Sequence, residues 1–378
     1  MYKAYKFRIY PSDSQKELIH KNFGCKRYVY NYYLNRIKNN GYVNAYTNIK
    51  DYTSSLKYEA PFLTEVDSLL IRKSIFSLDD NFKKHYQNGF GFPKFKSKYE
   101  RNSYSTNAIY GSYKDKNYCN IELDLVKRVV KLPKLKEIKI RGYRTTNKIN
   151  GKIINATISK EANNKYYVSI VFEIPNISKI IRATSIVGID VGIKKLLTLS
   201  DGTIYDNNKY LKKYEKRIKR KQRELSRKER GSNNYYKCKR ELNILYIKLK
   251  NARKFYLHKI TKDITDNNDI IITEKLTVKK MIMKKTLSKN LNDAALSEII
   301  RQLTYKTKHK GKYFYQIDTY YPSSQVCSVC GTKDKKYKDL MLREYECTKC
   351  NSKLDRDYNA SVNIMFEGLK LYMKENLA

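Results

Sequence analysis

The sequence has 378 residues, of which 79 are Lys or Arg and 37 are Asp or Glu, so its formal net charge is +42. This length suffices for two or three domains. The charge favours a polyanionic partner, nucleic acid first, because Lys and Arg bind phosphates and release counterions. A membrane surface is the rival polyanion, but we find no run of about 18 apolar residues and no signal peptide, so we expect neither a membrane-spanning nor a secreted protein.

The N-terminal region opens with a strand and continues as helices. Residues 1–11 alternate apolar and basic positions as far as Pro11, which is typical of a strand with one buried face. Ser12-Asp13-Ser14-Gln15 then supplies cap-forming residues for a helix. A second helical stretch is predicted over 64–87. We expect residues 12–88 to form a helical bundle with basic outer faces.

A glycine- and phenylalanine-rich segment at 89–96 ends the helical pattern. Alternating apolar positions separated by turns then predict a small β-barrel or sheet, which the first strand joins. The N-terminal region is therefore predicted to be a β-domain of residues 1–11 and 89–180 that carries 12–88 as a helical insertion. The five strand-like runs are Cys119–Leu123, Val126–Leu132, Glu137–Ile140, Lys152–Ile158 and Tyr166–Phe172.

The second half begins with an apolar strand over 186–190 and a hairpin over 195–205, whose Asp-Gly pair is a strong turn signal. Residues 209–265 are strongly basic and show two apolar stripes, which predicts a helical hairpin. Its charge could mark an ordinary solvated face, but the net charge of the chain favours a phosphate-binding wall.

The remaining elements complete an α/β order. Strand, hairpin, helices, strand, helix, strand and helix follow one another as in the RNase H-like fold. We therefore predict such a domain over 181–324 and 352–378. Its later pieces are a strand at 269–273, a basic stretch at 275–292, a helix at 294–309, a strand at 312–318 and a final helix from Asp357.

Three acidic residues stand at the ends of these elements: Asp190, Glu274 and Asp357. Taken singly, each is an ordinary turn or cap residue. In the RNase H-like order, however, the two strands and the last helix can bring them together. Carboxylates gathered in this way bind two Mg²⁺ ions about 4 Å apart, which activate a water and stabilise a leaving 3′ oxygen. We predict that all three are catalytic and bind magnesium.

Four of the seven cysteines form two C-x2-C pairs, Cys327 with Cys330 and Cys347 with Cys350. Two such pairs at this spacing are typical of a structural zinc ribbon, here over 325–351, and an iron–sulfur site is the minor rival. An odd cysteine count without a secretory signal fits a reduced cytosolic setting rather than disulfides. No histidine has a ligand spacing, and without a G-x-x-x-x-G-K-[ST] loop ATP-driven helicase chemistry is disfavoured.

At this point the ordered motifs resemble TnpB, the RNA-guided nuclease family of bacterial insertion sequences that is related to compact type V CRISPR effectors. The resemblance covers nearly the whole chain. Its motifs are Tyr5–Pro11, Pro93–Lys96, Gly188–Gly192, Thr273–Leu276, Ser324–Gly331 and Asp355–Ala360.

The resemblance implies a RuvC-like nuclease domain with Asp190, Glu274 and Asp357 as its acids, and a zinc ribbon that feeds single-stranded DNA to them. It also implies a wedge β-barrel with a helical recognition insertion at the N-terminus. Asp357 is preferred over Asp355 because the family's acid directly precedes x-Asn-Ala. Lys275 departs from the acidic residue that the family has after the glutamate.

The resemblance further implies a guide RNA from the transposon end and metal-dependent cutting of double-stranded DNA beside a short motif. The protein is expected in the bacterial cytoplasm at the nucleoid, as a monomer in its RNA complex, with no membrane partner. Three alternatives stay open: a CRISPR-associated miniature type V effector, a non-cleaving RNA-guided regulator, and a transposase. The presence of all three acids argues for cleavage.

Overall fold

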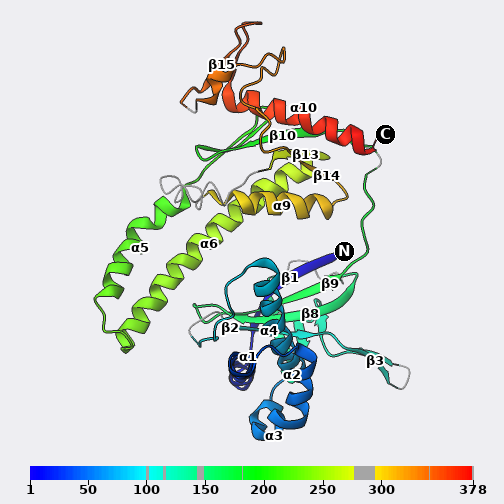
Figure 1. The fold of residues 1–378 in the computed structure, drawn as a ribbon, viewed down its shortest axis with the longest axis vertical. Helices are drawn as coiled ribbons and strands as arrows, with labels where there is room; N and C mark the ends of the chain where they lie inside the picture. Colours follow the sequence, from blue (N-terminus) through cyan, green and yellow to red (C-terminus); the bar gives the residue numbers. More distant parts are fainter. Residues whose placement is uncertain are drawn as a thin grey trace. The chain divides into compact units, whose positions relative to one another are not determined.

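The protein divides into two compact units, Met1–Asn176 and Ile177–Ala378, each with its own hydrophobic core (Figure 1). The computed structural model describes residues 1–98, 102–113, 116–142, 149–180, 182–275, 294–339 and 341–376. Most of the predicted basic stretch 275–292 lies outside these residues. Among the helices that are described, none is both long and apolar enough to cross a membrane.

The first unit is a β-sheet with helices inserted after its first strand. In chain order its elements are β1 (Tyr2–Tyr10), α1 (Asp13–Asn40), α2 (Ala45–Asp51), the π-helix η1 (Tyr52–Leu56), α3 (Lys57–Glu59), the 3₁₀ helix η2 (Pro61–Thr64), α4 (Ser68–Asn88), β2 (Asn102–Asn107), β3 (Tyr110–Tyr113), β4 (Lys116–Cys119), β5 (Glu122–Asp124), β6 (Val129–Leu132), β7 (Lys136–Arg141), β8 (Lys152–Lys160) and β9 (Tyr166–Glu173).

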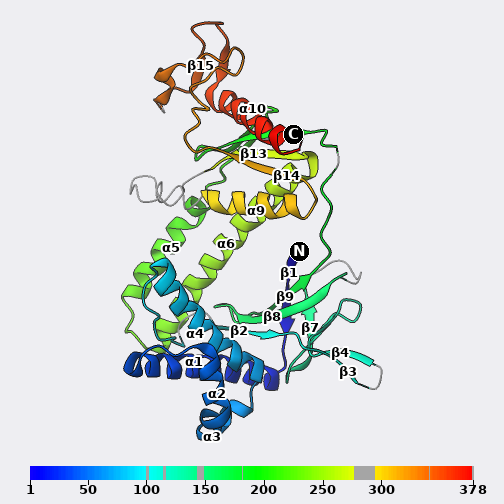
Figure 2. The same ribbon diagram turned by 45° about the vertical axis from the view of Figure 1, so that its right-hand side comes forward.

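Helix α1 begins where the sequence predicts. Ser12 accepts a hydrogen bond from the Gln15 backbone N–H at 3.3 Å, and the Gln15 side chain accepts one from the Ser12 N–H at 2.9 Å. This reciprocal capping box satisfies two backbone donors at the helix start. Helix α4 lies beside α1, and both contact β2 (Figure 2).

Seven strands of the first unit form one antiparallel sheet in the order β2-β8-β9-β1-β7-β6-β5. The first strand of the chain therefore lies in the middle of the sheet, as predicted. Within the described residues, β2 and β5 are the two ends of this order, so backbone hydrogen bonds do not close the sheet into the expected barrel.

The predicted strand Cys119–Leu123 is wrong, because the chain turns between β4 and β5. The Asn120 side chain holds this turn: its Oδ1 accepts from the Ile109 N–H at 2.7 Å, and its Nδ2 donates to Asn107 O at 3.1 Å. Strand β2 was not predicted at all. Its sequence, Asn-Ser-Tyr-Ser-Thr-Asn, has one apolar side chain and so lacks the alternating apolar signal.

The second unit contains β10 (Ile186–Val191), β11 (Lys195–Leu199), β12 (Ile204–Asp206), α5 (Tyr210–Ser226), α6 (Asn233–Asn267), β13 (Ile270–Glu274), α9 (Leu296–Lys308), β14 (Tyr313–Ile317), the 3₁₀ helix η3 (Lys335–Lys338), β15 (Glu344–Glu346), β16 (Lys353–Asp355) and α10 (Arg356–Asn376). Its main sheet has the order β12-β11-β10-β13-β14. Strands β12, β11 and β10 pair antiparallel, whereas β10, β13 and β14 pair in parallel. This is the predicted RNase H-like arrangement.

Helices cover both faces of this sheet (Figure 1). Ile271 of β13 packs in one core with α6 and α9, whereas Ile270 and Ile272, which point the other way, pack in a second core with Ile364 of α10. This alternation explains the continuous apolar run of the strand, because a strand buried on both faces needs apolar residues at every position.

Candidate active site

The two predicted strand acids lie at one edge of the sheet. Strands β10 and β13 are parallel neighbours, and their register pairs Ile189 with Thr273. Asp190 and Glu274 each follow these partners by one residue, so their backbones are adjacent where the two strands end. Parallel strands place their carboxyl ends on the same edge, which is where open α/β sheets carry their sites.

Helix α10 brings the third acid to this edge. Gly188 of β10 lies directly against the helix, because a Cβ atom there would come 2.2 Å from Ser361 O and 2.5 Å from Met365 N. Gly368 of α10 makes the same kind of contact with the side chain of Ile272. With no side chain at these two positions, α10 lies close against the sheet, and Asp357 stands in its first turn.

Asp355 and Asp357 have different environments. The Asp355 carboxylate accepts hydrogen bonds from the backbone N–H groups of Asp357, at 3.0 Å, and Tyr358, at 3.1 Å, and it pairs with Lys195 at 2.7 Å. It is therefore a helix cap. Asp357 instead forms a long ion pair with Arg343, whose Nη1 lies 3.9 Å from its carboxylate. This difference supports the preference for Asp357 as the site acid.

Burial and neighbouring charge shift the pKa values of the two strand acids. Loss of hydration raises the pKa of Asp190 to about 8, and the negative charges of Glu274 and Asp357 add to this rise. A hydrogen bond from the Val191 N–H and the positive charge of Arg356 lower the pKa, but by less. Burial also raises the pKa of Glu274, although a hydrogen bond from Ser323 acts in the opposite sense. Like charges crowded in this way favour a protonated acid or a bound cation. Carboxylate oxygens are the ligands that Mg²⁺ prefers. Among the described residues, however, the group whose ligand atoms already lie close enough together to hold an ion is the cysteine cluster, so the magnesium site of the three acids stays a prediction.

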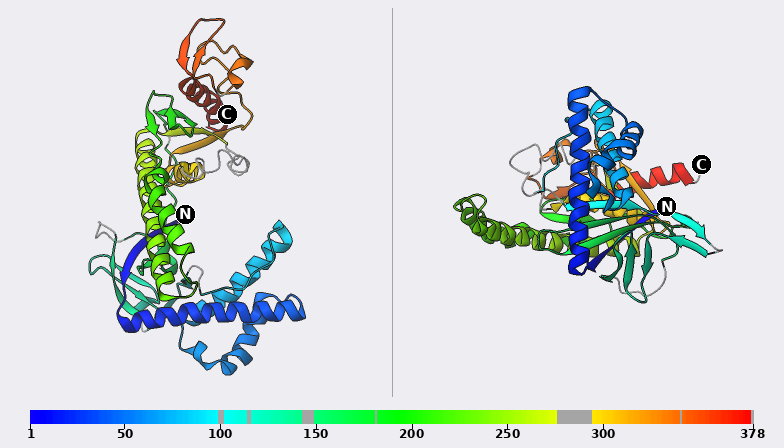
Figure 3. Two further views of the ribbon diagram at one scale, coloured as in Figure 1. Left: turned by 90° about the vertical axis from the view of Figure 1, so that its left-hand side faces the viewer. Right: turned by 90° about the horizontal axis from the view of Figure 1, so that it is seen from below.

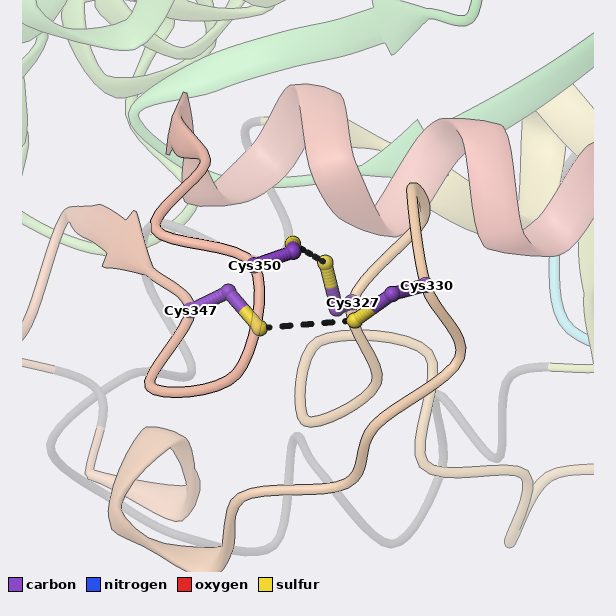
Figure 4. Close-up of side chains that lie close together, drawn as sticks. All are labelled: Cys327, Cys330, Cys347 and Cys350. Atoms are coloured by element: carbon purple, nitrogen blue, oxygen red, sulfur yellow. Dashed lines mark hydrogen bonds between the residues drawn. The ribbon is translucent and has the colours of Figure 1, made fainter.

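The four predicted cysteines meet in the module that precedes α10 (Figure 4). Their sulfur atoms all lie within 4.8 Å of one another, and all four thiols are free. Cys327 and Cys350 are 3.7 Å apart, and Cys330 and Cys347 are 3.5 Å apart. A tetrahedron with Zn–S bonds of about 2.3 Å has edges of about 3.8 Å, so the cluster is the right size to hold zinc.

The two cysteine loops have matching backbones. In the first, the Gly331 N–H donates to Cys327 O at 2.9 Å, and in the second the Asn351 N–H donates to Cys347 O at 2.9 Å. Gly331 and Asn351 both adopt positive φ, at 74° and 56°. Such turns direct N–H groups toward sulfur. Hydrogen bonds from Thr332 lower the pKa of the Cys330 thiol to about 6, which favours the thiolate that a metal binds.

The helical hairpin of α5 and α6 is rich in Lys and Arg. The two helices lie side by side (Figure 3). A hollow of about 1040 Å³ along α5 is lined by Lys216, Arg217, Lys219, Arg220, Arg223, Glu224, Arg227 and Lys228. Only one of these eight residues is acidic. Such a surface attracts a polyanion, in agreement with the predicted phosphate-binding wall.

The first unit has a smaller basic pocket of about 350 Å³ between α1, α4 and β2. Its walls carry Lys26, Arg27 and Lys96 together with the aromatic side chains of Phe23 and Tyr30. Cations beside aromatic rings suit both the phosphates and the bases of nucleic acid. The sequence predicted a basic helical region here but did not single out this pocket.

Several residues around the acids were missed by sequence reasoning. Ser323 donates to Glu274 of β13. The buried Arg356, Asn359 and Asn363 of α10 donate to the backbone oxygens of Asp339, Val326 and Ser323, respectively. Arg356 and Asn359 lie within the motif Asp355–Ala360, although no role was predicted for them, whereas Ser323 and Asn363 lie just outside the motifs. Nothing in their local sequence showed which partners they would have.

Family models match three parts of the chain. The OrfB_IS605 model, described as a probable transposase, matches residues 169–285, and the Cas12f1-like TNB domain matches residues 297–364. A helix-turn-helix model of OrfB_IS605 matches residues 1–42, where the structure has strand β1 followed by the single helix α1.

Relatives match over nearly the full length. A protein of Streptomyces pristinaespiralis, with the provisional name RNA-guided DNA endonuclease, is 29% identical over 97% of this chain and 89% of its own. InsQ of Escherichia coli K12, provisionally named in the same way, is 29% identical over 97% of this chain and 92% of its own. The fold also resembles that of Cas12f1, solved in an sgRNA–target DNA complex, with a TM-score of 0.58, 15% identity and coverage of 97% and 98% of the two chains.

The sheet order and the similarity to the solved structure define an RNase H-like fold, and a cysteine module lies beside its last helix. The family comparisons agree with the motifs of the sequence. Domains of the OrfB_IS605 family and full-length relatives with the provisional name RNA-guided DNA endonuclease match the chain, so the resemblance to TnpB predicted from the sequence is confirmed.

Proposed function

We propose that this protein is an RNA-guided endonuclease that cuts double-stranded DNA beside a short motif. The observation that carries the proposal is the approach of Asp190, Glu274 and Asp357 at one edge of an RNase H-like sheet. The names of the full-length relatives support the same activity.

In the proposed mechanism, the carboxylates of Asp190, Glu274 and Asp357 would hold two Mg²⁺ ions. Bound Mg²⁺ supplies an activated water and stabilises charge on the leaving 3′ oxygen. The protein sets the positions of the acids: the strand ends fix Asp190 and Glu274, and the first turn of α10 fixes Asp357. Arg343, beside Asp357, provides a positive charge where a phosphate would enter.

The cysteine module, in this proposal, binds one structural Zn²⁺ through Cys327, Cys330, Cys347 and Cys350. All four ligand positions are filled by protein, so the zinc has no open position for catalysis. The module adjoins α10, and its chain leads directly into the helix that carries Asp357. It is therefore well placed to guide a single DNA strand toward the acids.

The first unit and the basic hairpin take the nucleic acids. We propose that the seven-stranded sheet is the wedge domain and that residues 12–88 are the recognition insertion. The guide RNA comes from the transposon end, and its pairing with DNA supplies sequence specificity. The basic hollow along α5 grips a backbone by charge and shape rather than by sequence. The protein acts at the nucleoid as a monomer in its RNA complex.

The test is to express the chain with its flanking genomic DNA, purify it and sequence the RNA that copurifies. We expect one abundant RNA that ends in a variable segment. The variable segment identifies the target sequence. In a DNA library that carries this target beside random flanking sequences, some members should be cut on both strands in Mg²⁺. Heterogeneous RNA with no guided cleavage would overturn the proposal.

The same assay separates the alternatives. The matching family is described as a probable transposase, and joined DNA ends in the reaction products would favour that activity. Guided binding without cutting in Mg²⁺ would indicate a regulator. A repeat array beside the gene would indicate a CRISPR-associated effector with the same chemistry.

A further inference from the structure

A short segment connects the acids to the cysteine module. We call residues 323–328 the strap; it begins at Ser323 and contains Cys327. The Ser323 hydroxyl donates a hydrogen bond to Oε1 of Glu274, a residue 49 positions earlier in the chain. Ser323 is only 6% exposed, so water does not readily replace this contact. One carboxylate oxygen of Glu274 is thereby engaged.

Two buried asparagines of α10 hold the strap in place. Asn363 Nδ2 donates to Ser323 O at 2.8 Å and to Val326 O at 2.6 Å. Asn359 Nδ2 donates to Val326 O at 2.7 Å, while its Oδ1 accepts from the Ser328 N–H at 2.8 Å. Residues four apart share one helix face, so the strap runs along the side of α10. Both ends of the Ser323 contact are therefore fixed to the RNase H-like core.

The other end of the strap is part of the cysteine cluster. Cys327 is 1% exposed, and its N–H donates to Thr332 O at 2.9 Å in the first cysteine loop. The opposite side of the module is held by Arg356, whose Nη1 donates to Asp339 O at 2.6 Å and to Leu342 O at 3.1 Å. A displacement of Cys327 would thus be transmitted to Ser323 through four peptide units.

We propose that Ser323 is a positioning residue for the divalent-metal site, and that the cysteine module fixes the orientation of Glu274 through it. The inference rests on the proposed metal-binding role of Glu274. Its physical basis is that hydrogen bonds to a ligating carboxylate set its rotamer, and their loss typically weakens metal binding by about 10–100-fold. In this view the cysteine module contributes to the metal site, because it sets the orientation of the Glu274 carboxylate, which lies outside the module.

The experiment measures Mn²⁺ binding, not only cleavage. Full-length, zinc-loaded protein free of nucleic acid is titrated with Mn²⁺ by calorimetry, with zinc content and melting temperature measured on the same samples. Ser323→Ala is compared with Ser328→Ala, which removes the same hydroxyl from the strap at a position whose side chain does not contact Glu274. Ser323→Thr is a conservative control that keeps the hydroxyl group. Asp190→Asn removes one carboxylate of the proposed site, so the Mn²⁺ that this variant still binds measures binding elsewhere on the protein.

We expect Ser323→Ala to raise the Kd for Mn²⁺ about tenfold or more. Its zinc content and melting temperature should match those of Ser328→Ala, and both Ser328→Ala and Ser323→Thr should bind Mn²⁺ like the wild type. The inference is overturned if Ser323→Ala binds Mn²⁺ within about twofold of the wild type, if it loses zinc or stability in step with affinity, or if Ser323→Thr is weakened equally.

Failure of the proposed function has a separate signature. If the wild type binds Mn²⁺ no better than Asp190→Asn, the acids are not a metal site, and the proposed function and the inference both fall. If the wild type binds Mn²⁺ and cuts guided DNA while Ser323→Ala is unchanged in affinity, only the inference falls.

Discussion

A Cβ atom on Gly188 would lie 2.2 Å from the backbone carbonyl oxygen of Ser361. Strand β10 and helix α10, far apart in the chain, therefore touch backbone to backbone at this point. Because Asp190 follows Gly188 by two residues and Asp357 precedes Ser361 by four, this contact sets the distance between two of the three acids. The close approach depends on the absence of a side chain rather than on any specific interaction.

Substitution Gly188→Ala should push α10 away from the sheet. We expect a loss of about 1–3 kcal/mol or more in the stability of the second unit, since a backbone cannot yield as a side chain does. Guided cleavage should fall as well. Thermal unfolding followed by circular dichroism checks this, with Gly24→Ala as the control. A Cβ at Gly24 meets nothing within 4 Å, and alanine there should be neutral or stabilising by about 0.5–1 kcal/mol. Equal melting temperatures for the two variants would contradict the prediction.

The assignment of the acids predicts a contrast between neighbouring aspartates. Asp357→Asn should lower guided cleavage by roughly three orders of magnitude or more, as losses in a catalytic unit do, and should leave DNA binding intact. Asp355→Asn should stay close to wild type, because an asparagine also caps a helix and the ion pair with Lys195 is partly exposed. A cleavage assay and a filter-binding assay on both variants measure guided cleavage and DNA binding separately. An inactive Asp355→Asn beside an active Asp357→Asn would reverse the assignment.

The raised pKa of Asp190 predicts how stability depends on pH without divalent metal. The folded protein holds a proton up to about pH 8, whereas the unfolded chain releases it near 3.8. Folding is therefore favoured at low pH, and the free energy of unfolding falls as pH rises between these values, by at most about 1.4 kcal/mol per unit.

Asp190→Asn should remove this contribution and make the metal-free protein more stable at pH 7.5 than the wild type. Denaturant unfolding at pH 6 and pH 7.5 measures the difference, followed by circular dichroism because the chain has no Trp. Added Mg²⁺ should stabilise the wild type and not the variant. Identical pH slopes for the two proteins would show that Asp190 is not protonated in the fold.

The cysteine cluster predicts a defined effect of losing one ligand. Cys327→Ser should lose stoichiometric zinc and unfold the module, because a structural zinc site supplies much of the folding free energy of a small module. Cys119→Ser is the matched control, since that thiol lies in the first unit outside the cluster. Elemental analysis of the purified proteins measures zinc. A Cys327→Ser protein with one zinc per chain and wild-type activity would refute the assignment.

The basic hollow along α5 predicts a salt effect. The double substitution Arg223→Gln and Arg227→Gln should weaken RNA binding and lower the slope of log K against log salt by about one for each phosphate that the variant no longer binds. The exposed Lys57, which lies on the short helix α3, gives a control substitution to glutamine. Binding measured at several salt concentrations distinguishes the two. An unchanged slope would remove α5 from the RNA-binding surface.

The order of the second unit could be predicted from sequence because its signals are local. Strand 186–190 and strand 269–273 are rich in apolar residues, and the basic helices show clear apolar stripes. Once the order of elements was fixed, the meeting of Asp190 with Glu274 followed from parallel pairing. The cysteine cluster could be predicted because the spacing within each C-x2-C pair is also a local signal.

Features that depend on distant partners could not be predicted. The contact of Ser323 with Glu274 joins residues 49 positions apart, and no periodicity marks either one as the partner of the other. Strand β2 is polar, and it is a strand because β8 pairs with it, not because of its own composition. The open order of the described strands in the first sheet, with β2 and β5 at its ends, could not be predicted either, since edge pairing is a property of the whole sheet.

The backbone contact at Gly188 also has a consequence for protein synthesis. Strand β10 leaves the ribosome long before α10, so Asp190 and Glu274 exist in the nascent chain while their third partner has not yet been made. The first unit can fold during this interval, because all its strands and helices precede residue 177. The three acids can come together only after α10 has been translated and has packed against Gly188, so a nascent chain that ends before residue 357 lacks the complete candidate site.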